Sequence, residues 1–197
     1  KGYFTMRLQE NLELDLRERV KKFQSITYPR VIRNGSSYSQ TEIFTRRALS
    51  LCVWTYRRLN ETNQTARLLR DVIDFLLRRY HGYCIKEKFG AHYREVGVKP
   101  DEKIDFEHVI PAAIARDLLL HGFMSITEAM NIPTCMVRRA NHKKLNSNKL
   151  AKTTPDLNKF WERYSILNIQ VETHRGDAVD MATWDLAKHY QYFNIQP

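Results

Sequence analysis

An acidic residue and a histidine, Glu107 and His108, stand side by side in the segment DEKIDFEHVIPAA, which runs from residue 101 to 113. Imidazole exchanges protons near neutral pH and a carboxylate can hold a hard cation, so both types suit acid-base or metal chemistry. The stretch KIDFEHVI is β-prone and has glycines and prolines on its flanks, which predicts a strand. Neighbouring side chains on a regular strand point to opposite faces, so a shared site needs a bend near Pro111.

A second polar run follows later in the chain, from Thr134 to Lys149. Thr134 to Val137 is a short β-prone run, and the polar sequence ANHKKLNSNK comes after two arginines that close it. One helical turn or two over this sequence would place His142, Asn146 and Lys149 at helical spacing. The pattern therefore predicts a strand that leads directly into a short basic helix.

These two segments together resemble the HNH, or His-Me finger, nuclease superfamily. In that family an acid-histidine pair closes a first strand and is followed by two aliphatic residues and often a proline, as in Glu107-His108-Val109-Ile110-Pro111. A second strand and a short helix then supply a further histidine or asparagine. The resemblance covers roughly residues 100 to 152 and implies two antiparallel strands and a helix around one divalent ion, a ββα-metal module.

The resemblance also implies a role for individual residues. His108 becomes the general base, Glu107 one metal ligand and His142 another, with asparagines of the same helix as further candidates, namely Asn141 and, as its alternative, Asn146. Asn131 resembles the asparagine that braces the loop in family members, and Asp105 is given a supporting role. The expected cofactor is one divalent ion, Mg²⁺ first, with Mn²⁺ or Zn²⁺ as alternatives. The phosphate chain would lie on the basic residues Arg138, Arg139, Lys143, Lys144 and Lys149.

The distance in sequence from His108 to His142 is longer than in compact members of this family. The segment AAIARDLLLHG has helical periodicity and ends at His121-Gly122. In SITEAMN, Ser125 and Glu128 have the spacing of a capping box. An inserted helical pair between the two strands would account for the extra length.

The net charge and the apolar content of the sequence indicate which kinds of partner the protein can have. The 197 residues include 32 Lys plus Arg against 22 Asp plus Glu, a formal charge of +10, which indicates an anionic partner such as nucleic acid. No apolar run approaches the roughly 18 residues needed to span a bilayer, and no secretory signal is recognisable, so an intracellular location without membrane insertion is expected. Three well-separated cysteines predict neither a disulfide framework nor a cysteine-rich zinc site.

The first half of the chain has helical periodicity, with helices expected over residues 6–25 and 40–59 and over the sequence TARLLRDVIDFLLRRYH. The fold class is therefore α+β and mainly helical, with helices around a small ββα-metal module. Three regions are expected. Residues 1–89 are helical and either pack or bind nucleic acid, residues 90–152 hold the module with its helical insertion, and residues 153–197 pack on it through further helices.

The expected activity is metal-dependent endonucleolytic hydrolysis of phosphodiester bonds, with DNA expected before RNA. Two alternatives stay open. Asp101, Glu102 and Lys103 have the acid-x-lysine form of another metal-dependent nuclease class, for which the upstream acid would be Asp74, Glu87 or Glu95. The chain could also be a basic nucleic-acid-binding protein without catalysis, in which Glu107 and His108 are structural hydrogen-bonding groups.

Overall fold

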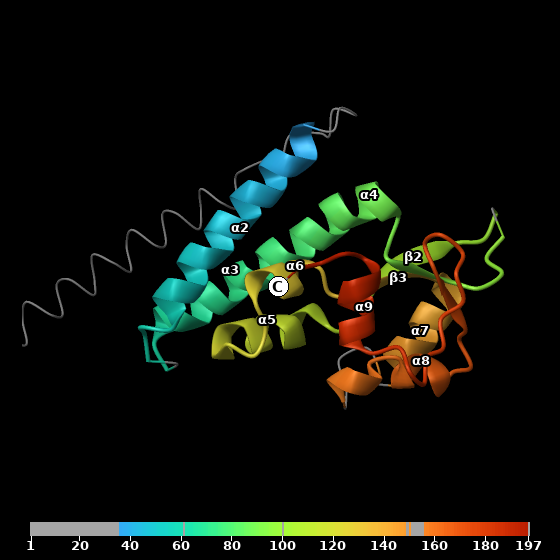
Figure 1. The fold of residues 1–197 in the computed structure, drawn as a ribbon. Coiled ribbons are helices and arrows are strands. Elements are labelled where there is room, and N and C mark those ends of the chain that lie inside the picture. The colour runs from blue at the N-terminus through green and yellow to red at the C-terminus, as the bar shows by residue number, and fades with distance from the viewer. Residues whose placement is uncertain (1–35, 61, 100, 149, 151–155, 197) are drawn as a thin grey trace, which may run out of the picture.

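The computed structural model describes residues 36–60, 62–99, 101–148, 150 and 156–196. The helix expected over residues 6–25 and the predicted phosphate contact Lys149 lie outside the described residues. The described chain is mainly helical with one small mixed sheet, so the expected α+β class is confirmed (Figure 1).

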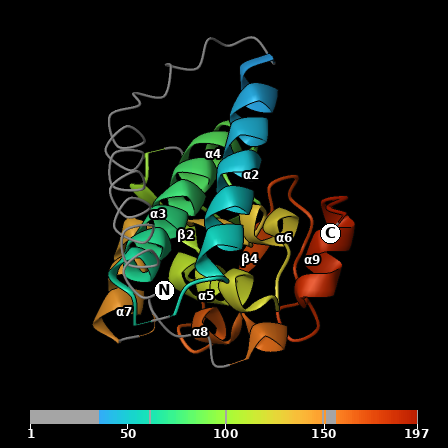
Figure 2. The same ribbon diagram turned by 90° about the vertical axis from the view of Figure 1, so that its left-hand side faces the viewer.

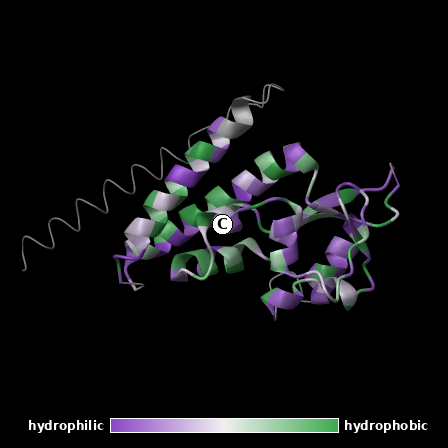
Figure 3. Cartoon of the chain, in the orientation of Figure 1, coloured by the Kyte–Doolittle hydropathy of each residue, from purple (hydrophilic) through white to green (hydrophobic). Residues whose placement is uncertain are grey.

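Two long helices, α2 (Ser36–Tyr56) and α3 (Gln64–Tyr80), pack against each other, in agreement with the periodicity of the sequence (Figure 2). Asn63 caps α3 by accepting a hydrogen bond from the backbone N–H of Thr65 at 2.7 Å. Polar and apolar residues alternate along both helices (Figure 3), and the apolar face of α3 is buried. The chain then continues into a π-helix, η1 (His81–Ile85), and the short α4 (Lys86–Phe89).

The expected helical insertion consists of α5 (Ala112–His121) and α6 (Ile126–Met130). Gly122 ends α5 in the left-handed conformation with φ of 82°, and Ser125 and Glu128 form the capping box that starts α6. Both helices pack against α2 and α3 and bury Leu119 and Met130 in the same hydrophobic core. The insertion therefore belongs to the helical body.

The described strands form one sheet in the order β2-β3-β1-β4, made of β1 (Tyr93–Glu95), β2 (Ile104–His108), β3 (Thr134–Arg138) and β4 (Val171–Thr173). β2 pairs with β3 in antiparallel register, from Ile104 opposite Arg138 to His108 opposite Thr134. β3 leads directly into α7 (Arg139–Ser147). The expected strand-strand-helix unit is thus present, but β1 extends it by pairing in parallel with β3, and β4 pairs with β1.

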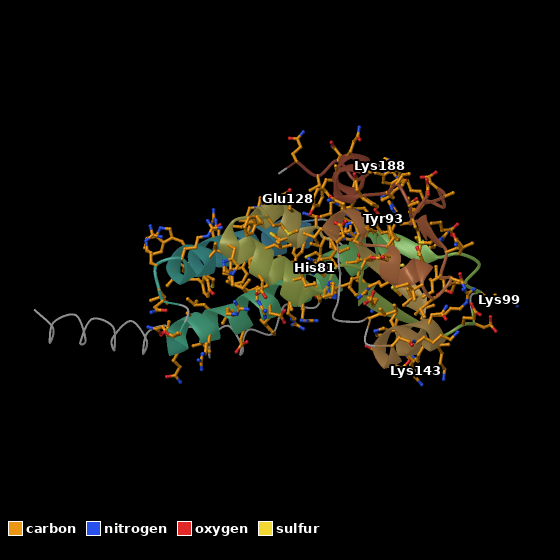
Figure 4. All side chains as sticks on the ribbon, turned by 90° about the horizontal axis from the view of Figure 1, so that it is seen from below. His81, Tyr93, Lys99, Glu128, Lys143 and Lys188 are labelled. Carbon is orange, nitrogen blue, oxygen red and sulfur yellow. The ribbon has the colours of Figure 1, made fainter. Side chains whose placement is uncertain are left out.

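A second hydrophobic core lies between the sheet and the C-terminal segments η3 (Leu157–Lys159), α8 (Glu162–Ser165) and α9 (Leu186–Tyr192). Its largest fully buried side chains include Trp161, Tyr164 and Tyr93. His81, at the start of η1, lies in the interior between the helical body and the sheet (Figure 4). The two cores therefore approach each other beside the end of β2.

Two composition-based expectations can be compared with the described chain. No helix in the described ranges has the length and apolar character needed to cross a membrane. Cys52, Cys84 and Cys135 are all buried and free of disulfide bonds.

Candidate active site

β2 is one of the two edge strands of the described sheet and carries the predicted acid-histidine pair at its end. Its ladder with β3 is continuous from residue 104 to 108, so side chains alternate between the two faces. Phe106 and His108 share one face, with ring centroids 5.6 Å apart. Asp105 and Glu107 share the other. The bend that would bring Glu107 and His108 together does not occur within the strand.

Glu107 is engaged in a buried ion pair. One carboxylate oxygen accepts a hydrogen bond from Arg163, and the other accepts one from the hydroxyl of Tyr164 at 2.5 Å. Arg163 also donates to the carbonyl of His108 at 2.8 Å. Burial, together with the neighbouring carboxylate, raises the pKa of Tyr164 well above its ordinary value, which keeps its proton available for this bond. The structure therefore places the carboxylate of Glu107 in the second core, away from the imidazole of His108.

His108 has a partner that the sequence did not indicate. Its Nε2 lies 3.1 Å from Nδ1 of His81, and Nε2 of His81 lies 3.0 Å from the carbonyl oxygen of Ala129. Burial, with the positive charges of Arg78 and Arg163, lowers the pKa of His108 to about 4. Burial, with the neighbouring His108, also lowers the pKa of His81 well below its ordinary value. Both rings are therefore neutral at pH 7.

A pocket of about 630 Å³, here called the β2 pocket, opens beside His108. It lies between α3, the start of α5, the edge of β2 and α7. Its polar lining includes Glu107, His108, His142 and Asn146, which the sequence had singled out for the metal site, together with Asp74, Arg78 and Arg116. The complete lining is Asp74, Arg78, Phe106, Glu107, His108, Pro111, Ala112, Ala113, Arg116, His142 and Asn146.

His142, on α7, contacts Asp105, on β2. Nδ1 of His142 lies 3.1 Å from Oδ2 of Asp105, while Nε of Arg139 donates to Oδ1 at 3.0 Å. The hydrogen bonds from His142 and Arg139 lower the pKa of Asp105. The ionised carboxylate can only accept, so Nδ1 of His142 carries a proton and Nε2 is the nitrogen left without a contact to Asp105.

Asn141 and Arg138 lie in a different group of side chains. The amide of Asn141 donates to Glu95 at 2.7 Å, and Arg138 forms ion pairs with Glu95 and with Glu102. Arg138 also donates to the carbonyl of Gly97. These contacts tie β3 and the start of α7 to β1 and the following loop, and neither Asn141 nor Arg138 lines the β2 pocket.

The predicted ligands do not form a divalent-ion site as they are arranged. Among the described residues, no group of three or more His, Cys, Asp or Glu side chains is placed to hold a metal ion. Both oxygens of Glu107 have protein partners, and Asn141 belongs to the group around Glu95. His142 and Asn146 remain in the pocket, but one imidazole and one neutral amide do not fit Mg²⁺, which takes oxygen ligands and carboxylates in particular.

Cations lie on the helical wall of the pocket and on the surface of α7. Arg139, Lys143 and Lys144 are exposed on α7, where Figure 4 labels Lys143. On the helical side, Arg78 and Arg116 lie in a network that also contains one further arginine and two aspartates, with the contacts Arg70 to Asp117, Arg116 to Asp117, Arg116 to Asp74 and Arg78 to Asp74. Of this network, Arg78, Arg116 and Asp74 line the pocket, so two arginines face one aspartate on this wall.

The remaining predicted residues lie outside the β2 pocket. Asn131 donates from its side chain to the carbonyl of Thr127 at 2.8 Å, and so braces the end of α6. In the alternative nuclease motif, Glu102 accepts hydrogen bonds from the backbone of Lys99 and from Arg138. Lys103 is exposed, and its carbonyl accepts the backbone N–H of Arg139 at 2.8 Å.

Comparison of the chain with protein-family models, with curated proteins and with solved structures gave no match.

Proposed function

We propose that the chain is a nuclease that hydrolyses phosphodiester bonds of nucleic acid, DNA before RNA, at the β2 pocket. The observation that supports this most directly is the position of His108 in the pocket. Its ring is neutral because burial lowers its pKa to about 4, and it lines a pocket that also presents two arginines. Within the described residues, Nδ1 of His108 has no hydrogen-bond partner, so a lone pair is available to a water molecule in the pocket.

In the proposed reaction, His108 accepts a proton from water while the water oxygen bonds to phosphorus. The ester bond to the leaving oxygen then breaks, and that oxygen takes a proton from solvent. Arg78 and Arg116 hold phosphate oxygens and offset the charge that develops on them. A positioned general base of this kind typically contributes about 10²–10⁴-fold to the rate. The requirement for a divalent ion, which the family resemblance implies, stays a prediction, and no step here passes through an ion.

The test is cleavage of supercoiled plasmid, of a single-stranded DNA and of an RNA of the same sequence by the full chain. His108→Ala should lower the rate by about 10²-fold or more while substrate binding is retained. His121→Ala is a matched control, since His121 is exposed and does not line the β2 pocket. Lys103→Ala should have little effect, whereas a severe loss there would favour the alternative motif of Asp101, Glu102 and Lys103.

A second candidate is a nucleic-acid-binding protein without catalysis. It is favoured by the buried pairing of Glu107 with Arg163, because both oxygens of the predicted metal ligand already have partners within the protein. In this case the full chain would bind DNA with strong salt dependence and cleave it no faster than His108→Ala does. Fluorescence anisotropy and the plasmid assay on the same preparations separate the two functions.

A further inference from the structure

The hydrogen bonds around His81 fix the protonation pattern of two neighbouring rings. A carbonyl oxygen can only accept, so Nε2 of His81 must carry the proton that is shared with Ala129 at 3.0 Å. The His81 ring is fully buried and carries no charge at neutral pH, so its Nδ1 holds a lone pair. Nδ1 of His81 can therefore only accept a hydrogen bond.

The same reasoning extends to His108. Its Nε2 is 3.1 Å from Nδ1 of His81 and must be the donor, so the proton of the neutral His108 ring lies on Nε2. The lone pair is then on Nδ1, the ring nitrogen that has no partner among the described residues. His108 lines the β2 pocket and keeps part of its surface exposed, whereas His81 has none.

His81 is held firmly enough to impose this tautomer. It is the first residue of η1, a π-helical segment that interrupts an otherwise continuous helix, and such segments occur frequently at functional sites. Ala129 lies on α6, inside the insertion between β2 and β3. Two elements of the helical body thus hold the ring against the end of β2. This contact gives the helical region a direct connection to the candidate base.

We propose that His81 is the positioning residue of the active site: by accepting the Nε2–H of His108 it leaves Nδ1 of His108 as the atom that takes the proton from water. This inference rests on the proposed nuclease function. His81 itself touches no substrate, since it does not line the β2 pocket. The chain from the Ala129 carbonyl through His81 to His108 orients the base in the way that a carboxylate or a carbonyl orients the histidine of other hydrolytic sites.

Three variants separate the hydrogen bond from the packing. His81→Asn keeps an acceptor oxygen near the position of Nδ1, while His81→Phe fills the space without an acceptor. His189→Phe is the matched control, because His189 is also a fully buried histidine but its hydrogen bonds go to Tyr93 and to the carbonyl of Asn131. Long-range proton-nitrogen NMR spectra of the full chain with ¹⁵N-labelled histidine report which ring nitrogen is protonated. The signals of His108 are assigned by their loss in His108→Ala.

The wild-type chain, His81→Asn and His189→Phe should all show His108 protonated at Nε2, whereas His81→Phe should show a mixture of tautomers. In the cleavage assay His81→Phe should lower kcat about tenfold or more, as part of the general-base contribution, with KM unchanged and with recovery in His81→Asn. A wild-type His108 that is protonated at Nδ1, or a tautomer unchanged in His81→Phe, would overturn the proposal. If His81→Phe alters the tautomer of His108 but leaves kcat unchanged, the positioning role of His81 is overturned while the nuclease function stands. Cleavage that survives in His108→Ala would instead overturn the proposed function, and the NMR spectra would still report the tautomer.

Discussion

The carboxylate of Glu107 and the guanidinium of Arg163 form an ion pair in the second core, where their side chains are 8% and 1% exposed. They are 56 positions apart in the sequence, and Arg163 also donates to the carbonyl of His108. The pair therefore anchors the end of β2 to α8. The hydrogen bond from Arg163 also fixes the backbone position of His108, whose side chain lines the pocket.

Breaking this pair should destabilise the protein. Glu107→Gln leaves the buried charge of Arg163 without its partner, and a loss of this kind typically lowers the free energy of unfolding by about 3–5 kcal/mol. Urea unfolding measures the loss. Glu162→Gln is the matched control, because Glu162 is exposed at the start of α8. The double variant Glu107→Gln with Arg163→Met should be less destabilised than the sum of the two single changes, and additive losses would contradict a direct coupling.

Removal of divalent ions tests the cofactor separately from the fold. The family resemblance predicts that plasmid cleavage stops in EDTA and returns with Mg²⁺ or Mn²⁺. The carboxylate of Glu107 is taken up by Arg163 and Tyr164, so Glu107→Gln should leave the half-saturating ion concentration unchanged, as measured at a temperature where the variant is folded. A rise of tenfold or more in that concentration would make Glu107 a ligand and would mean that its ion pair opens during the reaction.

The arginines on the helical side of the pocket should contribute to phosphate binding. Arg78→Ala together with Arg116→Ala should weaken DNA binding and reduce the slope of log K against log salt by about 0.9 per lost contact with duplex phosphate. Fluorescence anisotropy over a salt series measures this slope. Arg47→Ala removes the same kind of charge from an exposed site on α2 that does not line the pocket. If Arg47→Ala changes the slope as much per removed charge as the double variant does, the effect comes from the net charge of the protein and not from contacts in the pocket.

Arg138 should behave as a structural residue, in contrast to the phosphate-binding role expected from the sequence. Its guanidinium contacts Glu95, Glu102 and the carbonyl of Gly97, so its donors are committed within the protein. Arg138→Ala should lower the free energy of unfolding by about 1–3 kcal/mol, since it leaves the buried carboxylate of Glu95 short of a partner. The salt dependence of DNA binding should stay as in wild type. A reduced slope without a loss of stability would return Arg138 to the phosphate-binding surface.

Local signals in the sequence were sufficient for several elements. β-prone residues with flanking glycine and proline located β2, Gly122 located the end of α5, and Ser125 with Glu128 located the start of α6. Each of these depends on residues close together in the chain. The succession of β3 and α7 also followed from neighbouring residues.

Long-range partners could not be derived in the same way. β1 and β4 have only three residues each, too few for a periodic pattern, and their pairing joins segments far apart in sequence. The partnership of His81 with His108 spans 27 positions, and a histidine at the end of an amphipathic helix resembles any packing residue. The sequence did not determine which face of the sheet Glu107 occupies, because a bend near Pro111 was possible. The regular ladder of β2 with β3 places Glu107 on the face opposite His108.

The buried histidines should make the protein sensitive to mild acid. Burial lowers the pKa of His189 to about 3 and that of His108 to about 4, and it lowers the pKa values of His81 and His92 as well. Histidines in the unfolded chain titrate near pH 6.5, so below this pH the unfolded state binds more protons than the folded state, and stability falls as the pH falls toward 4. Each such histidine contributes a slope of about 1.4 kcal/mol per pH unit once its unfolded form is protonated.

Urea unfolding at pH 7, 6 and 5 should therefore show a loss of stability between pH 6 and 5 that exceeds the value for one histidine. His189→Phe should be less stable at pH 7 but should lose less on acidification, because one of the titrating rings is gone. Equal slopes for wild type and His189→Phe would mean that His189 is already protonated in the folded protein, which its hydrogen bond with the hydroxyl of Tyr93 and its complete burial argue against.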